Sequence, residues 1–135
     1  MSLERFIIKQ KEFYPIVFKE LENGKKETHW MWFVFPQIAG LGTSYMATYY
    51  VIKDKDEAIS YFNDDYLRNN YLNLCNALLC LNTNDAIKVF GDIDAMKLKS
   101  SLTLFYLISG NFTIKMVLDK YYNGELDGFT KNKLI

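Results

Sequence analysis

Apolar residues recur every three or four positions along most of the chain, which is the spacing of amphipathic helices. The clearest stretches cover residues 3–23, 65–81 and 92–109. Segments that alternate between apolar and polar residues are few, and the β-branched residues are scattered rather than clustered. Both features argue against strands. The pattern therefore predicts an all-α fold of about seven to nine helices.

Residues with cap chemistry mark where these helices are expected to begin and end. The expected caps are Asn23-Gly24, Ser44, Asp54 with Glu57, Thr83 or Asn84, Asp92 or Asp94, Gly110 and Gly124. Pro15 falls within the first stretch. Proline has no backbone N–H and disfavours helical geometry at the residue before it. We therefore expect the first stretch to break or kink there.

Length and composition indicate one compact globular domain over residues 1–135. Half of the residues are hydrophobic and 16% are aromatic, so the chain is expected to fold. Sixteen Lys and Arg balance sixteen Asp and Glu, which gives a formal net charge of zero. This balance argues against binding of nucleic acid by bulk positive charge.

The N-terminal residues contain no signal peptide, because Glu4, Arg5 and Lys9 interrupt any apolar run. With two cysteines, the chain is expected to be a cytoplasmic protein with reduced thiols. Two cysteines and one histidine are too few for a typical structural zinc site. We therefore expect neither a metal nor a cofactor.

One stretch, residues 29–52, contains no Asp, Glu, Lys or Arg and holds the single histidine and both tryptophans. It is long enough to be considered as a membrane span. Pro36, Gln37, Gly40 and Gly42 interrupt it, however, and a lipid-exposed backbone cannot leave the helix there without unpaired polar groups. We predict no membrane contact. The stretch instead predicts a short buried helix, a turn and a second helix that line a core or pocket.

Gly40 and Gly42 lie just before the helix that Ser44 is expected to cap, over residues 45–51. Glycines let a backbone approach a ligand closely, and a helix N-terminus offers unpaired N–H groups. A phosphate or carboxylate site is one interpretation. The other is that the glycines form a tight turn and Ser44 only caps the helix.

Further candidates in this stretch each have a functional and a structural interpretation. His29 is a candidate for proton transfer, or a half-buried histidine bonded to backbone. Gln37 could read the polar edge of a ligand or satisfy the loop. Trp30 and Trp32 could stack on a ring or pack in the core.

On the helix over residues 92–109, Asp94, Lys97 and Ser101 share one face. Lys97 with Ser101 has the composition of a Ser–Lys nucleophile pair. The alternative is that Lys97 forms a surface ion pair with Asp94. Lys97 is also the expected second contact for an anion bound near Ser44.

Three segments resemble the bacterial family catalogued as domain of unknown function 1810. They are LERFIIKQKEFYPIVFKELENGKK (3–26), HWMWFVFPQIAGLGTSYMATYY (29–50) and FGDIDAMKLKSSLTLF (90–105). The resemblance implies a compact, all-helical, stand-alone cytosolic domain, and it supplies no activity. It places emphasis on His29, Trp30, Trp32, Phe35, Pro36, Gln37, Gly40, Gly42, Ser44, Lys97, Ser100 and Ser101.

These observations predict a domain that binds a small ligand, with an anion site at the start of the helix after Ser44. Both binding alone and catalysis remain open, with His29 as the catalytic candidate. The expected ligand-binding residues are His29, Trp30, Trp32, Gln37, Gly40, Gly42, Ser44, Lys97 and Ser101. The alternative is a protein–protein interaction module that uses an exposed aromatic patch.

Overall fold

The structure, a computed structural model, describes residues 3–134. This part of the chain contains nine helices and no strand, so the prediction of an all-α fold is confirmed. In chain order they are α1 (Glu4–Glu22), α2 (Met31–Val34), α3 (Tyr45–Tyr49), α4 (Lys55–Asn63), α5 (Asp65–Leu79), α6 (Ala86–Phe90), α7 (Asp92–Ser109), α8 (Phe112–Tyr122) and α9 (Gly128–Leu134).

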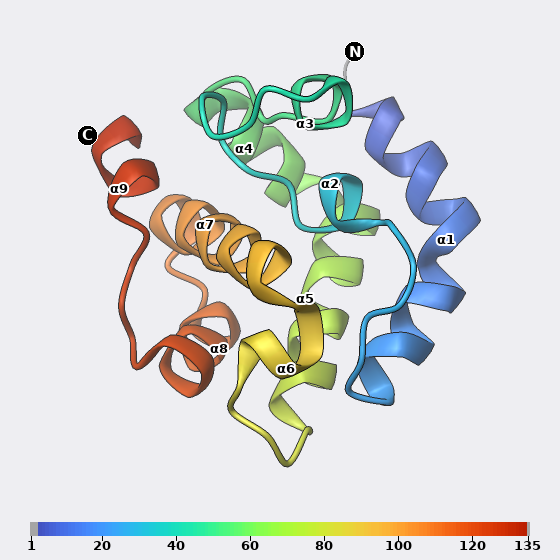
Figure 1. The fold of residues 1–135 in the computed structure, drawn as a ribbon. Coiled ribbons are helices and arrows are strands. Elements are labelled where there is room, and N and C mark those ends of the chain that lie inside the picture. The colour runs from blue at the N-terminus through green and yellow to red at the C-terminus, as the bar shows by residue number, and fades with distance from the viewer. Residues whose placement is uncertain (1–2, 135) are drawn as a thin grey trace.

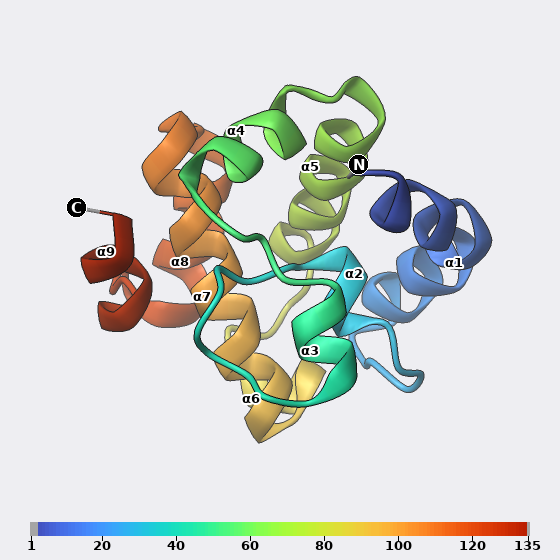
Figure 2. The same ribbon diagram turned by 90° about the horizontal axis from the view of Figure 1, so that it is seen from above.

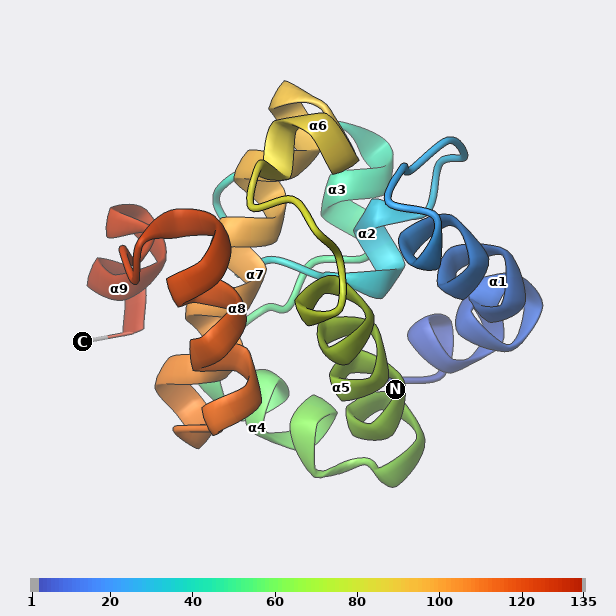
Figure 3. The same ribbon diagram turned by 90° about the horizontal axis from the view of Figure 1, so that it is seen from below.

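Helix α7 lies at the centre of the molecule and packs against α4, α6, α8 and α9 (Figure 1). Its buried residues are Ala95, Leu98, Ser100, Ser101, Leu102, Thr103, Leu104 and Phe105. A helix with apolar or small residues around so much of its circumference is typical of a core. Seen from below, α5 crosses the fold between α1 and α8 and contacts both (Figure 3).

The expected break at Pro15 is wrong, because α1 continues unbroken from Glu4 to Glu22. The proline removes the hydrogen bond to the carbonyl of Lys11, four residues earlier. Both Pro15 and Lys11 are exposed, so water can satisfy that carbonyl. On the opposite face Phe6, Val17 and Leu21 are fully buried, and this packing holds the helix together.

Side-chain caps begin α3, α4, α5, α6 and α8, and two of these caps, Ser44 and Asp54, are the predicted residues. Ser44 Oγ accepts from the N–H of Ala47, and Asp54 Oδ1 accepts from the N–H of Glu57. The expected cap of α6 at Thr83 or Asn84 is wrong. Asp85 caps it instead, because its carboxylate reaches two N–H groups of the first turn, at 3.0 and 3.2 Å.

The charge-free stretch forms α2, a long turn and α3, as predicted. Ile38 and Ile52 pair as a parallel bridge at the base of this segment, and both are buried. The N–H of Ala39 donates to the carbonyl of Ile52 at 2.9 Å, and the N–H of Ile52 donates to the carbonyl of Gln37 at 2.8 Å. Residues 39–51 therefore form a loop closed at its base, which extends toward α7 and returns through α3 (Figure 2). No helix within residues 3–134 is both long and apolar enough to cross a membrane.

Candidate functional site

A cleft of about 480 Å³ lies between this loop and the first half of α7. Its lining residues are Gln37, Leu41, Gly42, Thr43, Ser44, Ala47, Ile93, Met96, Lys97, Ser100 and Asp127. The volume falls within the range of small-molecule sites, and a few polar groups in an otherwise apolar lining are typical of them. A recess of about 20 Å³ shares Gln37, Leu41, Gly42, Ala47 and Lys97 with the cleft and adds Trp32 to the wall.

Lys97 supplies the positive charge of the cleft. Its ammonium nitrogen lies 5.3 Å from the ring centroid of Trp32 and 3.7 Å from Oδ1 of Asp94. The ion pair with Asp94 is as expected, but its length exceeds that of a hydrogen bond. Lys97 Nζ donates no hydrogen bond to any residue in 3–134. Its three donors are therefore available to a ligand.

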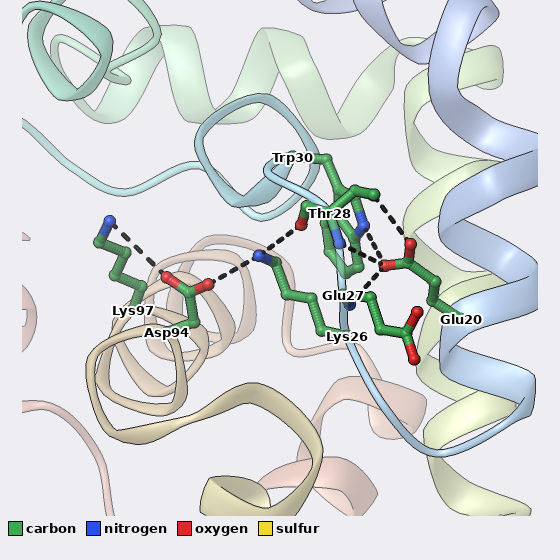
Figure 4. Close-up of polar contacts among 7 residues, drawn as sticks. All are labelled: Glu20, Lys26, Glu27, Thr28, Trp30, Asp94 and Lys97. Carbon is green, nitrogen blue, oxygen red and sulfur yellow. Dashed lines mark hydrogen bonds and ion pairs between the residues drawn. The ribbon is translucent and has the colours of Figure 1, made fainter.

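A second lysine, Lys26, lies closer to Asp94 than Lys97 does. The side chain of Lys26 is only 7% exposed, and its Nζ lies 2.8 Å from Oδ2 of Asp94. The same nitrogen donates to the carbonyl of Thr28 at 2.7 Å and lies 5.0 Å from the Trp30 ring centroid. Figure 4 shows Asp94 between the two lysines. Asp94 is therefore shared by two lysines, and its shorter contact is the one with Lys26.

Leu41, Gly42, Thr43 and Ser44 line the same cleft from the loop. The N–H groups of residues 41–44 donate to no acceptor within the described chain. Ser44 Oγ accepts the capping bond from Ala47, which leaves the hydroxyl hydrogen of Ser44 free to donate. Helix α3 has only five residues, so its dipole is small. Any anion here would be held by loop donors and Lys97 rather than by a helix terminus.

Asp127 brings a negative charge to the other side of the cleft. Its N–H donates to Oγ1 of buried Thr103 on α7 at 2.9 Å, which fixes its position. Its Oδ2 accepts from the N–H and hydroxyl of Thr130, at 3.0 and 2.6 Å. Oδ1 of Asp127 accepts no hydrogen bond within residues 3–134. Asp127 thus lines the cleft with one carboxylate oxygen that accepts no hydrogen bond in the described chain.

The cleft gathers Gln37, Gly42, Ser44 and Lys97 from the sequence-predicted set, and Trp32 lines the adjoining recess. The side chain of Gln37 is half-buried and has no hydrogen-bond partner in the described chain. Packing also favours glycine at position 42, because a Cβ at Gly42 would lie 2.7 Å from Cβ of Ala47.

Trp30 lies in the core and not in the cleft. It is fully buried, and its indole N–H donates to Oε1 of Glu20 at 2.8 Å (Figure 4). Burial alone would raise the pKa of Glu20. Hydrogen bonds from the N–H of Glu27, from Trp30 and from Thr28 outweigh it and lower that pKa below its ordinary value. His29, in the same segment, is exposed and does not line the cleft.

Ser101 also lies away from the cleft, fully buried against Tyr71 with 2.8 Å between the two hydroxyl oxygens. Burial raises the pKa of Tyr71 well above its ordinary value, so Tyr71 stays protonated and cannot serve as a base. No hydrogen bond in the described chain joins Ser101 to Lys97. The α7 serine that lines the cleft is Ser100, one residue earlier.

Gly40 has a structural role in the loop. Its φ is +110°, which side chains other than glycine rarely adopt, and an added Cβ would lie 2.8 Å from Cζ of Phe129. We expect Gly40→Ala to lower the free energy of unfolding by about 1–3 kcal/mol, because it combines backbone strain with a clash against α9. Urea denaturation measures this. Gly128→Ala is the control, since a Cβ at Gly128 meets nothing within 4 Å. Equal stabilities of the two variants would contradict the expectation.

Sequence reasoning missed Asp127, Ile93 and Met96. Asp127 is 30 positions from Lys97, and no local motif links the two. Ile93 and Met96 are three positions apart on the helix predicted over residues 92–109, so the sequence alone places them on one face of that helix. Their exposure, 70% and 72%, depends on what packs against that helix.

A second hollow, of about 490 Å³, lies between α1 and α5. It is lined by Tyr14, Phe18, Glu22, Asn73, Asn76, Ala77, Cys80 and Leu81. Glu22 is the charged residue of this lining, so the hollow is unsuited to an anion. The cleft beside α7, which contains Lys97 as well as Asp127, is better suited to an anion.

A family model described as "Protein of unknown function (DUF1810)" matches residues 1–134. The structure is similar to the crystal structure of the conserved hypothetical protein Rv1873 from Mycobacterium tuberculosis, with a TM-score of 0.95. The two sequences are 38% identical over 98% of this chain and 95% of that chain. A search of curated proteins gave no match.

Proposed function

We propose that this chain, which belongs to the DUF1810 family of proteins of unknown function, binds a small ligand through an anionic group. The anion, a phosphate or a carboxylate, lies between Lys97 and the loop of residues 41–44. The observation that carries the proposal is the cleft, which is lined by Lys97, whose ammonium forms no hydrogen bond in the described chain, and by loop residues 41–44, whose N–H groups have no acceptor there. Unpaired donors beside a cation are the groups that bind anions.

Other residues of the cleft would orient the rest of the ligand. Gln37 offers a donor and an acceptor from the loop, and the Trp32 ring lies beside the Lys97 ammonium, 5.3 Å from it. We propose binding rather than catalysis, because His29 lies outside the cleft and Ser101 lies in the core. We also propose a cytoplasmic location, since both cysteines are free thiols in the structure.

The second candidate function is a protein-interaction module. It is favoured by the exposure of Tyr45, Ile93 and Met96, each at least 70%. Other exposed apolar residues, however, are distributed over α1, α6, α8 and α9 rather than gathered on one face. Sedimentation of the protein over a range of concentrations tests self-association, one form of this candidate. The anion-binding proposal has the stronger support because its groups converge on one cleft.

Replacing Lys97 by methionine is expected to weaken anion binding at least tenfold. Hydrogen bonds to a charged group contribute about 1.5–3 kcal/mol, and about 1.4 kcal/mol corresponds to a factor of ten. Isothermal titration calorimetry with inorganic phosphate and with 4-methylpentanoate, at constant ionic strength, gives the affinities. Constant ionic strength is needed because salt screens the charge.

The matched control is Lys115→Met. Lys115 also forms one intrahelical ion pair, to Asp119 at 3.0 Å, and does not line the cleft. It should bind both anions as the wild type does. Equal affinities of the Lys97 variant and the wild type would contradict the proposal, as would a wild type that binds neither anion.

A further inference from the structure

Two opposite charges line the cleft without pairing with each other. No ion pair joins Lys97 to Asp127 in the described chain, although both side chains line the same cavity. Lys97 has no hydrogen-bond acceptor, and Oδ1 of Asp127 has no donor. The cleft therefore has a cation on α7, whose ion pair with Asp94 is 3.7 Å long, and, just before α9, a carboxylate with one oxygen that accepts no hydrogen bond in the described chain.

This polarity favours a ligand that carries both signs of charge. A simple anion would gain the attraction of Lys97 but would also face the carboxylate of Asp127. An ammonium on the same ligand turns that repulsion into attraction, since Coulomb interactions across a partly buried site are weakly screened. Charge complementarity of this kind selects among ligands of similar size.

Apolar residues at the rim of the cleft favour a ligand that also carries an apolar group. Ile93 and Met96 lie three residues apart on α7 and are 70% and 72% exposed, and Leu41 lines the cleft from the loop. An apolar group bound there would cover hydrophobic surface that is otherwise in contact with water, at roughly 25 cal/mol per Å². The site thus combines a donor set for an anion, an acceptor for an ammonium and an apolar surface.

We infer that the cleft binds a free α-amino acid with an apolar side chain. Its carboxylate lies at Lys97 and the 41–44 loop, its ammonium at Oδ1 of Asp127, and its side chain against Ile93 and Met96. This rests on the proposed function and specifies its ligand class.

Three small molecules separate the contributions that the carboxylate and the ammonium of the ligand make to binding. L-Leucine carries all three groups, 4-methylpentanoate lacks the ammonium, and 3-methylbutylamine lacks the carboxylate. Calorimetry on the wild type should show leucine binding at least tenfold more tightly than either analogue. Asp127→Asn should abolish the preference for leucine over 4-methylpentanoate while leaving the affinity for 4-methylpentanoate equal or higher.

Asparagine keeps an acceptor oxygen for Thr130, and Asp127→Ser is a second variant that retains N-cap chemistry without charge. Asp85→Asn is the matched control, because Asp85 caps α6 and does not line the cleft. It should bind all three probes as the wild type does. The melting temperature of each variant is measured to confirm folding.

Equal binding of leucine and 4-methylpentanoate by the wild type would overturn this inference and leave the anion site standing. A preference for leucine that persists in both Asp127 variants would overturn it in the same way. If the wild type bound neither phosphate nor any of the three probes, the anion site would be overturned as well.

Discussion

Replacing Trp30 by alanine is expected to lower the free energy of unfolding by about 3–5 kcal/mol, the usual cost of removing a large buried aromatic side chain. Trp30 is fully buried, with ring centroids of Phe35 and Phe90 each 6.3 Å away. The substitution also removes the indole donor to Glu20, a carboxylate that holds the turn before α2 through Glu27 and Thr28. Urea denaturation followed by far-ultraviolet circular dichroism measures the loss.

Trp32→Ala is the control, two residues away in the same charge-free stretch. Trp32 is half-buried and contacts Lys97 at the wall of the recess, so its loss should cost roughly 1 kcal/mol, as at other partly exposed sites. The comparison separates a core tryptophan from a site tryptophan. If Trp32→Ala destabilised the protein as much as Trp30→Ala, the assignment of the two residues would be wrong.

Gln10→Ala is expected to cost about 2–4 kcal/mol, because it leaves buried polar partners unpaired. Gln10 is 2% exposed, and its Nε2 donates to the carbonyl of Phe33 at 2.8 Å and to the hydroxyl of Tyr61 at 2.9 Å. Its Oε1 accepts from the amide of Asn70 at 3.1 Å. One side chain thus joins α1 to α2, α4 and α5. Thermal and urea unfolding should both report the loss.

Gln37→Ala provides the contrast for Gln10. Gln37 is half-buried, and its side chain has no hydrogen-bond partner in the described chain, so its removal should change stability by less than about 0.5 kcal/mol. A change as large as that of Gln10→Ala would show that Gln37 has a structural rather than a ligand-facing role.

Much of the fold is encoded locally, which is why the sequence could predict it. Helical spacing of apolar residues and the caps Ser44 and Asp54 placed α3 within two residues of its observed bounds and correctly placed the start of α4. Two local expectations were wrong. Pro15 did not break α1, because its packed face outweighs one lost hydrogen bond on the exposed face. Asp85 capped α6 because its short carboxylate side chain reaches the first turn directly.

The site was predictable only in part, because it is assembled from three segments far apart in the chain. The loop residues Gln37, Gly42 and Ser44 and the helix residue Lys97 were identified, since each has its own chemical signal. Helical spacing alone could not decide which serine of α7 faces the cleft, since that depends on the packing of α5. Tyr71 on α5 holds Ser101 in the core.

The charge balance of the cleft also depends on tertiary contacts. Lys26 is 68 positions before Asp94 in the sequence and would be expected on the surface, yet its side chain is almost fully buried against that carboxylate. Asp94 is therefore shared between Lys26, at 2.8 Å, and Lys97, at 3.7 Å. Although the net charge of the chain is zero, the cleft therefore contains a lysine, Lys97, whose ammonium forms no hydrogen bond in the described chain.

Anion binding in the cleft is tested most directly by a ¹H–¹⁵N correlation experiment in which 4-methylpentanoate, and separately inorganic phosphate, is titrated into the wild type at constant ionic strength. We expect saturable shifts that are largest at the backbone N–H groups of residues 41–44, and in Lys97→Met the same shifts should require at least tenfold higher anion concentrations. Anion binding in the cleft is contradicted if those resonances do not move, or if the largest shifts fall on the hollow between α1 and α5.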